Sequence, residues 1–297
     1  MIISICIPLY KSNMIYLKAA IESVLNQTSN SWKLILVDGN ELPSNEVKSY
    51  IDSINNPNIH YVINSGDRSI AGNWNYCLQV VDTDLVTLLH DDDYLACNYV
   101  EEMHILSSQY PDAAAFFSNV KTINSQGKTC LTVADFVKTL FRPNKVHLDL
   151  FGDNGLASLL LANHIFCPTL CYRFSKLPEG LFDTRWKMVV DFDLYWRILK
   201  EGHHLIGTSH KLYVYRRHAE NQTSKLTQSM VRFEEERDLY NEISCSIDPI
   251  KWPKAVKAAN SKLMIKLHVM FKLLTSIFTL DFVYAKSLFK FFLLMWR

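Results

Sequence analysis

The sequence has almost no net charge, and it lacks a long apolar run and a paired cysteine motif. It holds 31 basic and 30 acidic residues in 297, which is not the basic surplus expected of a nucleic-acid-binding protein. No uninterrupted apolar run reaches the roughly 18 residues that a membrane-spanning helix needs. The seven cysteines are scattered with no CxxC pair, which favours reduced thiols over disulfides or a zinc site.

The start of the chain also lacks the features of a secretory signal. Met1–Pro8 has no basic region and is too short for a signal peptide. Together with the reduced thiols, this predicts a cytoplasmic protein. If part of the chain contacts lipid, the location narrows to the inner face of the plasma membrane.

Two common nucleotide-binding motifs are absent. No G-x-G-x-x-G follows the first apolar stretch, and no G-x-x-x-x-G-K-[ST] occurs anywhere. This disfavours a nicotinamide-binding Rossmann domain and a P-loop nucleotidase. A nucleotide held by carboxylates and a metal ion remains compatible with the sequence.

Strand and helix patterns alternate through the first 90 residues. The patterns predict strands at 2–7, 32–37, 59–63 and 85–89, and helices at 13–26, 43–55 and 71–81. This alternation predicts βαβ units and a parallel sheet, whose ligands lie beyond the carboxyl ends of the strands. The segments Pro8–Tyr10, Asp38, Asp67–Arg68 and Asp91–Asp93 should therefore meet in one crevice.

The later chain is patterned less clearly. We predict a helix at 94–110, a strand at 113–118, covering loops at 119–155, a helix at 155–163, a strand at 166–172, a helix that begins near Asp191 and a strand at 205–215. The last strand leads into a loop that carries His218. Taken alone, Asp191 is either a helix cap or a functional acid, and His218 is either a surface residue or a ligand.

The stretch His90-Asp91-Asp92-Asp93 follows a wholly apolar strand. Adjacent carboxylates repel one another, so a bound cation would lower the cost of placing them together. Oxygen ligands of this kind suit Mg²⁺ or Mn²⁺, which accompany phosphate groups. The alternative is a solvated turn that caps the next helix, and Asp93 is our candidate for that cap.

Five stretches together resemble the family 2 glycosyltransferases of the GT-A fold. They are Ser4–Lys11, Leu34–Gly39, His90–Asp93, Val190–Arg197 and Tyr215–His218. In the family these correspond to the nucleotide-side turn, the second strand, the D-x-D motif, the acidic motif with the catalytic base and a late His segment. The resemblance implies an α/β fold, with a Rossmann-like, mostly parallel central sheet flanked by helices.

The resemblance also implies a domain organisation and site residues. Residues 1–225 would form the catalytic domain, divided into a nucleotide-sugar half (1–118) and an acceptor and catalytic-base half (119–225), with a helical extension at 226–297. The implied donor contacts are Pro8, Tyr10, Asp38 at the base and Asp91 near the ribose. The implied metal ligand is Asp92, with His218 as a further ligand or a phosphate partner, and the implied base is Asp191.

Three positions depart from the family pattern. His90 stands where the first Asp of D-x-D is expected, and Val190 stands where an acidic residue usually precedes the base. Where many members have an Arg, this chain has Gly72-Asn73-Trp74-Asn75. We assign the missing phosphate-binding charge to Arg68.

The resulting hypothesis is an inverting transfer by single displacement. Mn²⁺ or Mg²⁺ neutralises the diphosphate leaving group, and Asp191 takes the proton of the acceptor hydroxyl. Asp38 favours a uridine donor, so the protein would be a hexosyl- or N-acetylhexosaminyl-transferase. The acceptor would be a glycan or a polyprenyl-linked sugar. The alternatives are a metal-dependent nucleotidyltransferase and a non-catalytic module that binds nucleotide sugars or glycans.

Residues 251–297 are basic and amphipathic. They hold nine Lys or Arg and one acidic residue, Asp281. Apolar residues recur at helical spacing from Val256 to Leu274, with lysines mainly on the opposite side. These helices have three possible roles. They could pack on the catalytic domain, contact a second subunit in a homodimer, or make peripheral contact with an anionic membrane.

Overall fold

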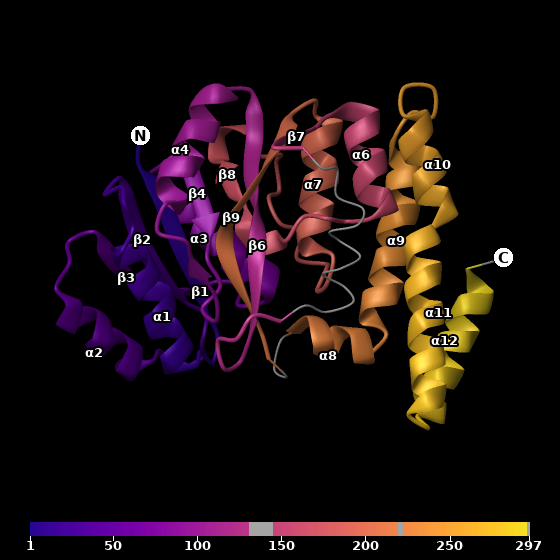
Figure 1. The fold of residues 1–297 in the computed structure, drawn as a ribbon, viewed down its shortest axis with the longest axis horizontal. Coiled ribbons are helices and arrows are strands. Elements are labelled where there is room, and N and C mark those ends of the chain that lie inside the picture. Colours follow the sequence, from indigo (N-terminus) through magenta and orange to yellow (C-terminus); the bar gives the residue numbers. More distant parts are fainter. Residues whose placement is uncertain (131–144, 219–221, 296–297) are drawn as a thin grey trace.

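The computed structural model describes residues 1–130, 145–218 and 222–295. Figure 1 shows a central sheet flanked by helices, with a group of C-terminal helices stacked at one side. The strands are β1 (Ile3–Leu9), β2 (Trp32–Asp38), β3 (Ile59–Ile63), β4 (Leu85–Leu88), β5 (Tyr94–Leu95), β6 (Ala113–Asn124), β7 (His147–Leu150), β8 (Cys171–Arg173) and β9 (His204–Arg217). The helices are α1 (Met14–Leu25), α2 (Asn45–Ile54), α3 (Ile70–Gln79), α4 (Tyr99–Gln109), α6 (Gly152–Leu161), α7 (Val190–Lys200), α8 (Gln222–Gln228), α9 (Val231–Ser246), α10 (Pro253–Ser261), α11 (Leu263–Phe278) and α12 (Phe282–Leu294).

The first half of the sheet is parallel. Strands lie in the order β3-β2-β1-β4, and each neighbouring pair is parallel. β1 is rich in β-branched residues and almost wholly buried, as expected of a strand covered on both faces. Asn13 caps α1 by accepting from the backbone N–H groups of Ile15 and Tyr16. The predicted βαβ units are confirmed.

The second half of the sheet is mixed. β4 continues into β8, β6, β9 and β5, and β7 adds to β9. β6 and β9 are parallel, whereas β8 is antiparallel to both of its neighbours. Two short 3-10 helices, η1 (Cys167–Thr169) and η2 (Phe174–Lys176), flank β8.

Hydrophobic cores cover both faces of the sheet. On one face, alternate β1 residues such as Ile5 and Ile7 pack with α1, α2 and α4. On the other face, Cys6 and Val86 share a cluster with α3, α6 and α7. α9, α10, α11 and α12 contribute buried side chains to this second cluster, so they are continuous with the sheet domain.

Several predicted boundaries in the middle of the chain are wrong. The predicted helix at 94–110 begins with the short strand β5, because Tyr94 and Leu95 pair with β9, and α4 starts only at Tyr99. The predicted loops at 119–155 include the end of β6, all of β7 and the start of α6. The rest of that segment, 131–144, lies outside the described residues. Within the predicted strand at 166–172, Cys167–Thr169 form η1, and only Cys171 and Tyr172 belong to β8.

The C-terminal helices are tied to the catalytic part by polar contacts. Asp153 on α6 accepts from the backbone N–H groups of Lys254 and Ala255, so it caps α10 from another helix. The Tyr240 hydroxyl on α9 donates to the Leu160 carbonyl. Among the described helices, none is both long and apolar enough to cross a bilayer. The boundary at 225/226 stays a prediction.

Candidate active site

The aspartate turn lies between β4 and β5, at the carboxyl edge of the parallel strands. Leu89 donates its backbone N–H to Cys6 on β1, and the Asp93 N–H closes the turn on the His90 carbonyl at 3.2 Å. β1 and β2 end at the same level, where Leu9 pairs with Asp38. Asp38 in turn pairs with Ile63 at the end of β3. These strand ends therefore share one edge, as the sequence predicts.

Asp93 is the structural member of the turn. It is fully buried, and its carboxylate accepts from the Arg216 backbone N–H at 2.6 Å and from the Tyr213 hydroxyl at 3.0 Å. Burial and the charge of Asp92 raise the pKa of Asp93 well above its usual range. The interpretation of Asp93 as a helix cap is wrong, because its partners lie on β9 and the next helix begins at Tyr99.

Asp92 is paired with His218. The two side chains approach to 2.7 Å between Asp92 Oδ2 and His218 Nε2, and both are about one-fifth exposed. Burial opposes ionisation of Asp92, but the His218 hydrogen bond and the charges of His90 and His218 together outweigh it, so the pKa of Asp92 is lowered. Arg216 fixes the turn from below by donating its Nε–H to the Asp92 carbonyl. Asp92 is therefore an anionic, partly accessible carboxylate.

His90 lies beside the carboxylates of Asp92 and Asp93. Its ring stacks on Trp74 with centroids 5.8 Å apart, and its Nε2 has no hydrogen-bond partner among the described residues. Burial lowers the pKa of His90, opposed first by the charge of Asp92 and then by that of Asp191. One donor atom each from His90, Asp92 and Asp93 lie within 4.8 Å of one another. This set of oxygen and imidazole donors fits a small divalent cation.

Asp91 faces the first loop. Burial raises its pKa to about 6, while the nearby Ser12 side chain opposes that rise. Pro8 lies near the end of β1, and Tyr10 follows it with an exposed ring. The structure places these three predicted donor-binding residues on neighbouring strand ends. Their contacts with a donor stay a prediction.

Asp38 organises the turn after β2. Its carboxylate is fully buried and accepts from the Asn40 and Ser44 backbone N–H groups, the Asn40 side chain and the Tyr61 hydroxyl. Burial raises the pKa of Asp38, but these hydrogen bonds outweigh it, so the pKa is lowered. The turn borders a hollow lined by Leu9, Lys11, Ser12, Asn40, Leu42, Ser44 and Val47. Sequence reasoning did not single out Asn40.

The turn between β3 and α3 is fixed by two buried asparagines. The Asn64 amide donates to Asn73 Oδ1 and to the Asp67 carbonyl, and the Asn64 carbonyl accepts from Arg68 Nε. A Cβ atom at Gly72 would lie 2.3 Å from Asp67 Cγ, so the Asp67 side chain needs glycine there. Arg68 is exposed at this turn, and its phosphate role stays a prediction.

Asp191 lies in the first turn of α7, as predicted. It is half-buried, and its charge acts on His90, which connects it electrostatically to the aspartate turn. Two residues later, Asp193 is buried and pairs with Arg197 at 2.8 Å and with the Trp196 indole N–H at 3.1 Å. Asp193 therefore braces the helix, whereas Asp191 is linked to the aspartate turn by its charge, and its role as a base stays a prediction.

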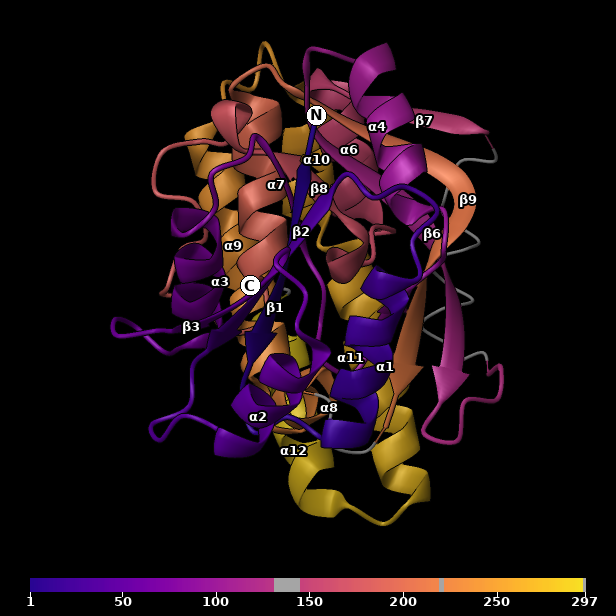
Figure 2. The ribbon, with the colours of Figure 1, turned by 90° about the vertical axis from the view of Figure 1, so that its left-hand side faces the viewer.

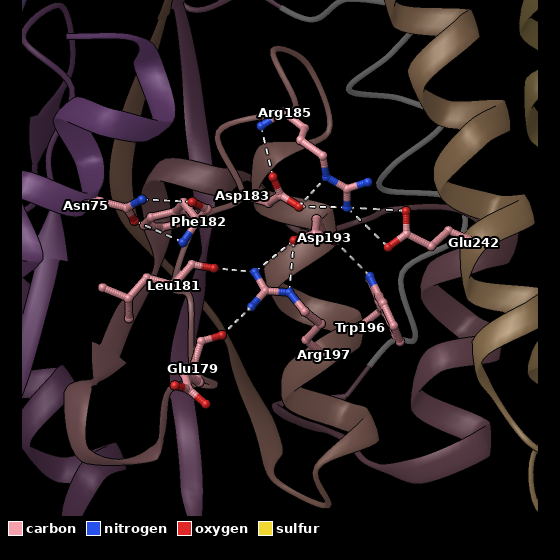
Figure 3. Close-up of polar contacts among 10 residues, drawn as sticks. All are labelled: Asn75, Glu179, Leu181, Phe182, Asp183, Arg185, Asp193, Trp196, Arg197 and Glu242. Atoms are coloured by element: carbon pink, nitrogen blue, oxygen red, sulfur yellow. Dashed lines mark hydrogen bonds and ion pairs between the residues drawn. The ribbon is translucent and has the colours of Figure 1, made fainter. Parts of the chain in front are cut away.

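A polar network holds the segment that leads into α7, as Figure 3 shows. Arg197 donates to the Leu181 and Glu179 carbonyls, and Arg185 bridges Asp183 and Glu242 of α9. Further along, the Glu235 carboxylate on α9 accepts from the backbone N–H groups of Lys187, Met188 and Val189. The helix that carries Asp191 is thus positioned from the C-terminal extension.

The supporting residues escaped the sequence analysis. Trp74, Tyr213, Arg216 and Glu235 hold the site through contacts across long sequence separations. An apolar ring in a helix or an acid in an amphipathic helix gives no local signal of such a partner. Arg216 belongs to the segment Tyr215–His218, but only the fold shows that it binds the aspartate turn.

Comparison with known proteins agrees with this geometry. Residues 4–147 match the family described as Glycosyl transferase family 2. The chain is 25% identical over 200 residues to "Putative colanic acid biosynthesis glycosyl transferase WcaA" of Escherichia coli (strain K12), covering 67% of each chain.

The fold is similar to that of S. aureus TarS. The 1–349 fragment, solved in complex with UDP-GlcNAc, matches 97% of this chain and 90% of its own length, with a TM-score of 0.63 at 13% identity. The longer TarS structure matches 89% of this chain with a TM-score of 0.60 at 14% identity, and this chain spans only 42% of its length. Together, the match over residues 4–147 and the relative WcaA support a family 2 glycosyltransferase, and the similarity to TarS shows that the sheet and its flanking helices form a GT-A fold.

Proposed function

We propose that this glycosyltransferase transfers a sugar from a UDP donor, with inversion, by a metal-assisted single displacement. The observation that carries this proposal is that the charges of Asp92, on the aspartate turn, and of Asp191, on α7, both act on His90. Asp92 is paired with His218 and is held as an anion, while Asp191 approaches from α7. The two carboxylates serve separate tasks, one at the leaving group and one at the acceptor.

Asp92 and His218 would hold Mn²⁺ or Mg²⁺, with His90 beside them. When bound, the cation supplies charge that stabilises the diphosphate as it leaves. The Asp92–His218 contact orients both groups toward the same point before any ligand arrives. Asp93 contributes indirectly, since its bonds to Tyr213 and Arg216 fix the turn that carries Asp92.

Asp191 would act as the general base. An acceptor hydroxyl becomes a strong nucleophile only as its proton is removed, and a positioned carboxylate removes it during attack. A mechanism with one base and no carboxylate nucleophile gives inversion in one step. Asp193 does not serve as a second acid, because Arg197 and Trp196 occupy its carboxylate.

The donor would bind along the carboxyl edge of β1 and β2. The hollow beside Asn40 and Ser44 would take the base, and Asp38 shapes it through the bonds that it accepts from those two residues. Asp91 would face the ribose, with Pro8 and Tyr10 along the nucleotide. Arg68 would neutralise phosphate charge. The UDP-GlcNAc complex of TarS, a protein of similar fold, supports a uridine donor carrying a hexose or N-acetylhexosamine.

The acceptor would be a hydroxyl of a glycan or of a polyprenyl-linked sugar. The test is to incubate the protein with a panel of nucleotide sugars and Mn²⁺ and to measure UDP release. We expect metal-dependent release of UDP from one UDP-sugar. NMR should then show that the product has the anomeric configuration opposite to that of the donor. A retained configuration would reject the single displacement, and release that is equal in EDTA would reject the metal.

A further inference from the structure

The outward face of α11 is wholly apolar. Every exposed residue of this helix is a large hydrophobic one, namely Leu263, Leu267, Met270, Phe271, Leu274, Ile277 and Phe278. They recur at three- and four-residue spacing and so form one stripe of about 24 Å along the helix. Its other face, with Ile265 and Val269, packs into the protein core.

The following turn and helix extend this surface. Leu280, Phe282 and Val283 are exposed at the connection, and Phe278 and Val283 are more than four-fifths exposed. On α12 the exposed residues are Phe282, Val283, Lys286, Ser287, Phe289, Lys290, Leu293 and Leu294. In the described chain, 13 of the 25 exposed large hydrophobic side chains lie between Leu263 and Leu294. Such a concentration marks a surface that is covered in use.

The charge of this segment decides between two candidate occupants of the surface, which are a second copy of the chain and an anionic membrane. Residues 251–297 carry nine basic residues and one acidic residue, whereas residues 1–250 carry 22 basic and 29 acidic residues. A second copy docked face to face would bring two basic segments together. An anionic lipid surface would instead attract them, because lysines near the headgroups are drawn to acidic lipids. The outward Lys286 and Lys290 lie among apolar side chains, as in helices that lie at a bilayer interface.

The apolar surface of α11 and α12 also lies where a membrane could approach the active site. Figure 2 shows β1 running from the N-terminus toward the lower end of the molecule, and the α11–α12 connection lies at that lower end in both Figure 1 and Figure 2. The carboxyl edge that carries the aspartate turn therefore faces the same way as the most exposed apolar residues. A membrane that contacts this connection would lie on the side of the active-site crevice.

We propose that α11 and α12 dock this enzyme onto an anionic membrane. The apolar stripe and the residues at the connection enter the headgroup region, and Lys286 and Lys290 contact acidic lipids. Docking in this orientation delivers a membrane-bound acceptor to the crevice, and that last step rests on the proposed function. Membrane binding itself does not depend on catalysis.

The test is cosedimentation of the full chain with vesicles of phosphatidylcholine, with and without phosphatidylglycerol. We expect binding to the anionic vesicles, and a loss of ~10-fold or more in a Phe278→Ser/Val283→Ser double variant, which alters only exposed side chains. The matched control is Ile15→Ser/Ile250→Ser, two equally exposed apolar residues outside this surface, which should bind like the wild type. Lys286→Gln/Lys290→Gln should remove the preference for phosphatidylglycerol.

Failure to bind either vesicle, or equal binding by the Phe278/Val283 variant, would overturn the proposal. Sedimentation equilibrium of the same proteins identifies the competing outcome. A dimer that dissociates in the Phe278/Val283 variant, without vesicle binding, would assign the surface to a second copy. UDP release measured without vesicles reports separately on the proposed function, so the two can fail independently.

Discussion

The carboxylate of Glu235 accepts a 2.7 Å hydrogen bond from the backbone N–H of Met188, which lies 47 residues earlier in the chain. It also accepts from Lys187 and Val189, so one side chain satisfies three amides just before α7. Val189 is the residue that precedes the first turn of α7, and Lys187 and Met188 lie just before it. A residue of α9 thus anchors the segment that leads into the helix carrying Asp191.

Replacing Glu235 should therefore affect turnover more than donor binding. We expect Glu235→Ala to lower kcat by about 10-fold, because a small displacement of Asp191 weakens proton transfer, and to leave the KM for the donor within about twofold. Loss of these hydrogen bonds should also destabilise the fold by about 1–2 kcal/mol in urea unfolding. Glu234→Ala, at the exposed neighbouring glutamate, is the matched control. A change in donor KM with unchanged kcat would contradict the positioning role.

Asp191→Asn should separate chemistry from binding. The amide keeps the shape of the side chain but cannot accept a proton, so turnover should fall by ~10²-fold or more. Calorimetry should show nearly unchanged affinity for UDP. The comparison variant is Asp193→Asn, which should instead lower Tm, because Asp193 is buried against Arg197 and Trp196. Wild-type turnover in Asp191→Asn would remove this residue from the mechanism.

Asp92→Ala should abolish the metal dependence of donor binding. In the wild type, titration of the UDP-sugar should give tighter binding with Mn²⁺ than with EDTA, and the variant should show the weaker affinity in both. His218→Ala should give a smaller loss, since the Asp92 carboxylate remains. Equal donor affinity with and without Mn²⁺ in the wild type would show that this metal site is wrong.

His268 should make stability depend on pH. Burial lowers its pKa from 6.5 to about 3, helped by the charges of Arg232 and Lys272, and its ring packs against Phe233 of α9. The unfolded chain therefore binds a proton below pH 6.5 that the folded chain refuses, so stability falls as the pH falls from about 6.5 toward 3. At pH 5 the loss should be about 1–2 kcal/mol.

Urea unfolding at pH 7 and pH 5 measures this effect. His268→Leu removes the titrating group and should reduce the difference between the two pH values by that amount. His60→Leu, at an exposed histidine on β3, is the control and should leave the difference as in the wild type. An unchanged pH dependence in His268→Leu would show that α11 does not depend on a neutral His268.

The alternating half of the fold could be predicted because its signals are local. β-branched strands, the Asn13 cap and the apolar face of α1 specify the first βαβ unit within about 40 residues. The middle of the chain could not be predicted in this way. Tyr94 and Leu95 are strand only because β9 lies beside them, and β9 is more than 100 residues away in the chain.

The site was predictable to a similar degree. Asp92 and Asp191 stand at the end of a strand and the start of a helix, which are positions that sequence patterns locate. Their partners are not, because no local pattern links Asp93 to Arg216 or His90 to Trp74. Asp93 shows the limit most clearly. A cap and a buried anchor have the same residue type, and only the tertiary partner distinguishes them.

The bond between Arg216 and Asp93 joins positions 123 residues apart. Closing such a loop is entropically costly and contributes nothing until both strands are in place, so contacts of this kind form late in folding. During synthesis, the aspartate turn would leave the ribosome long before β9 does. The emerging chain would then carry a first βαβ unit whose neighbouring aspartate turn still lacks its partners on β9.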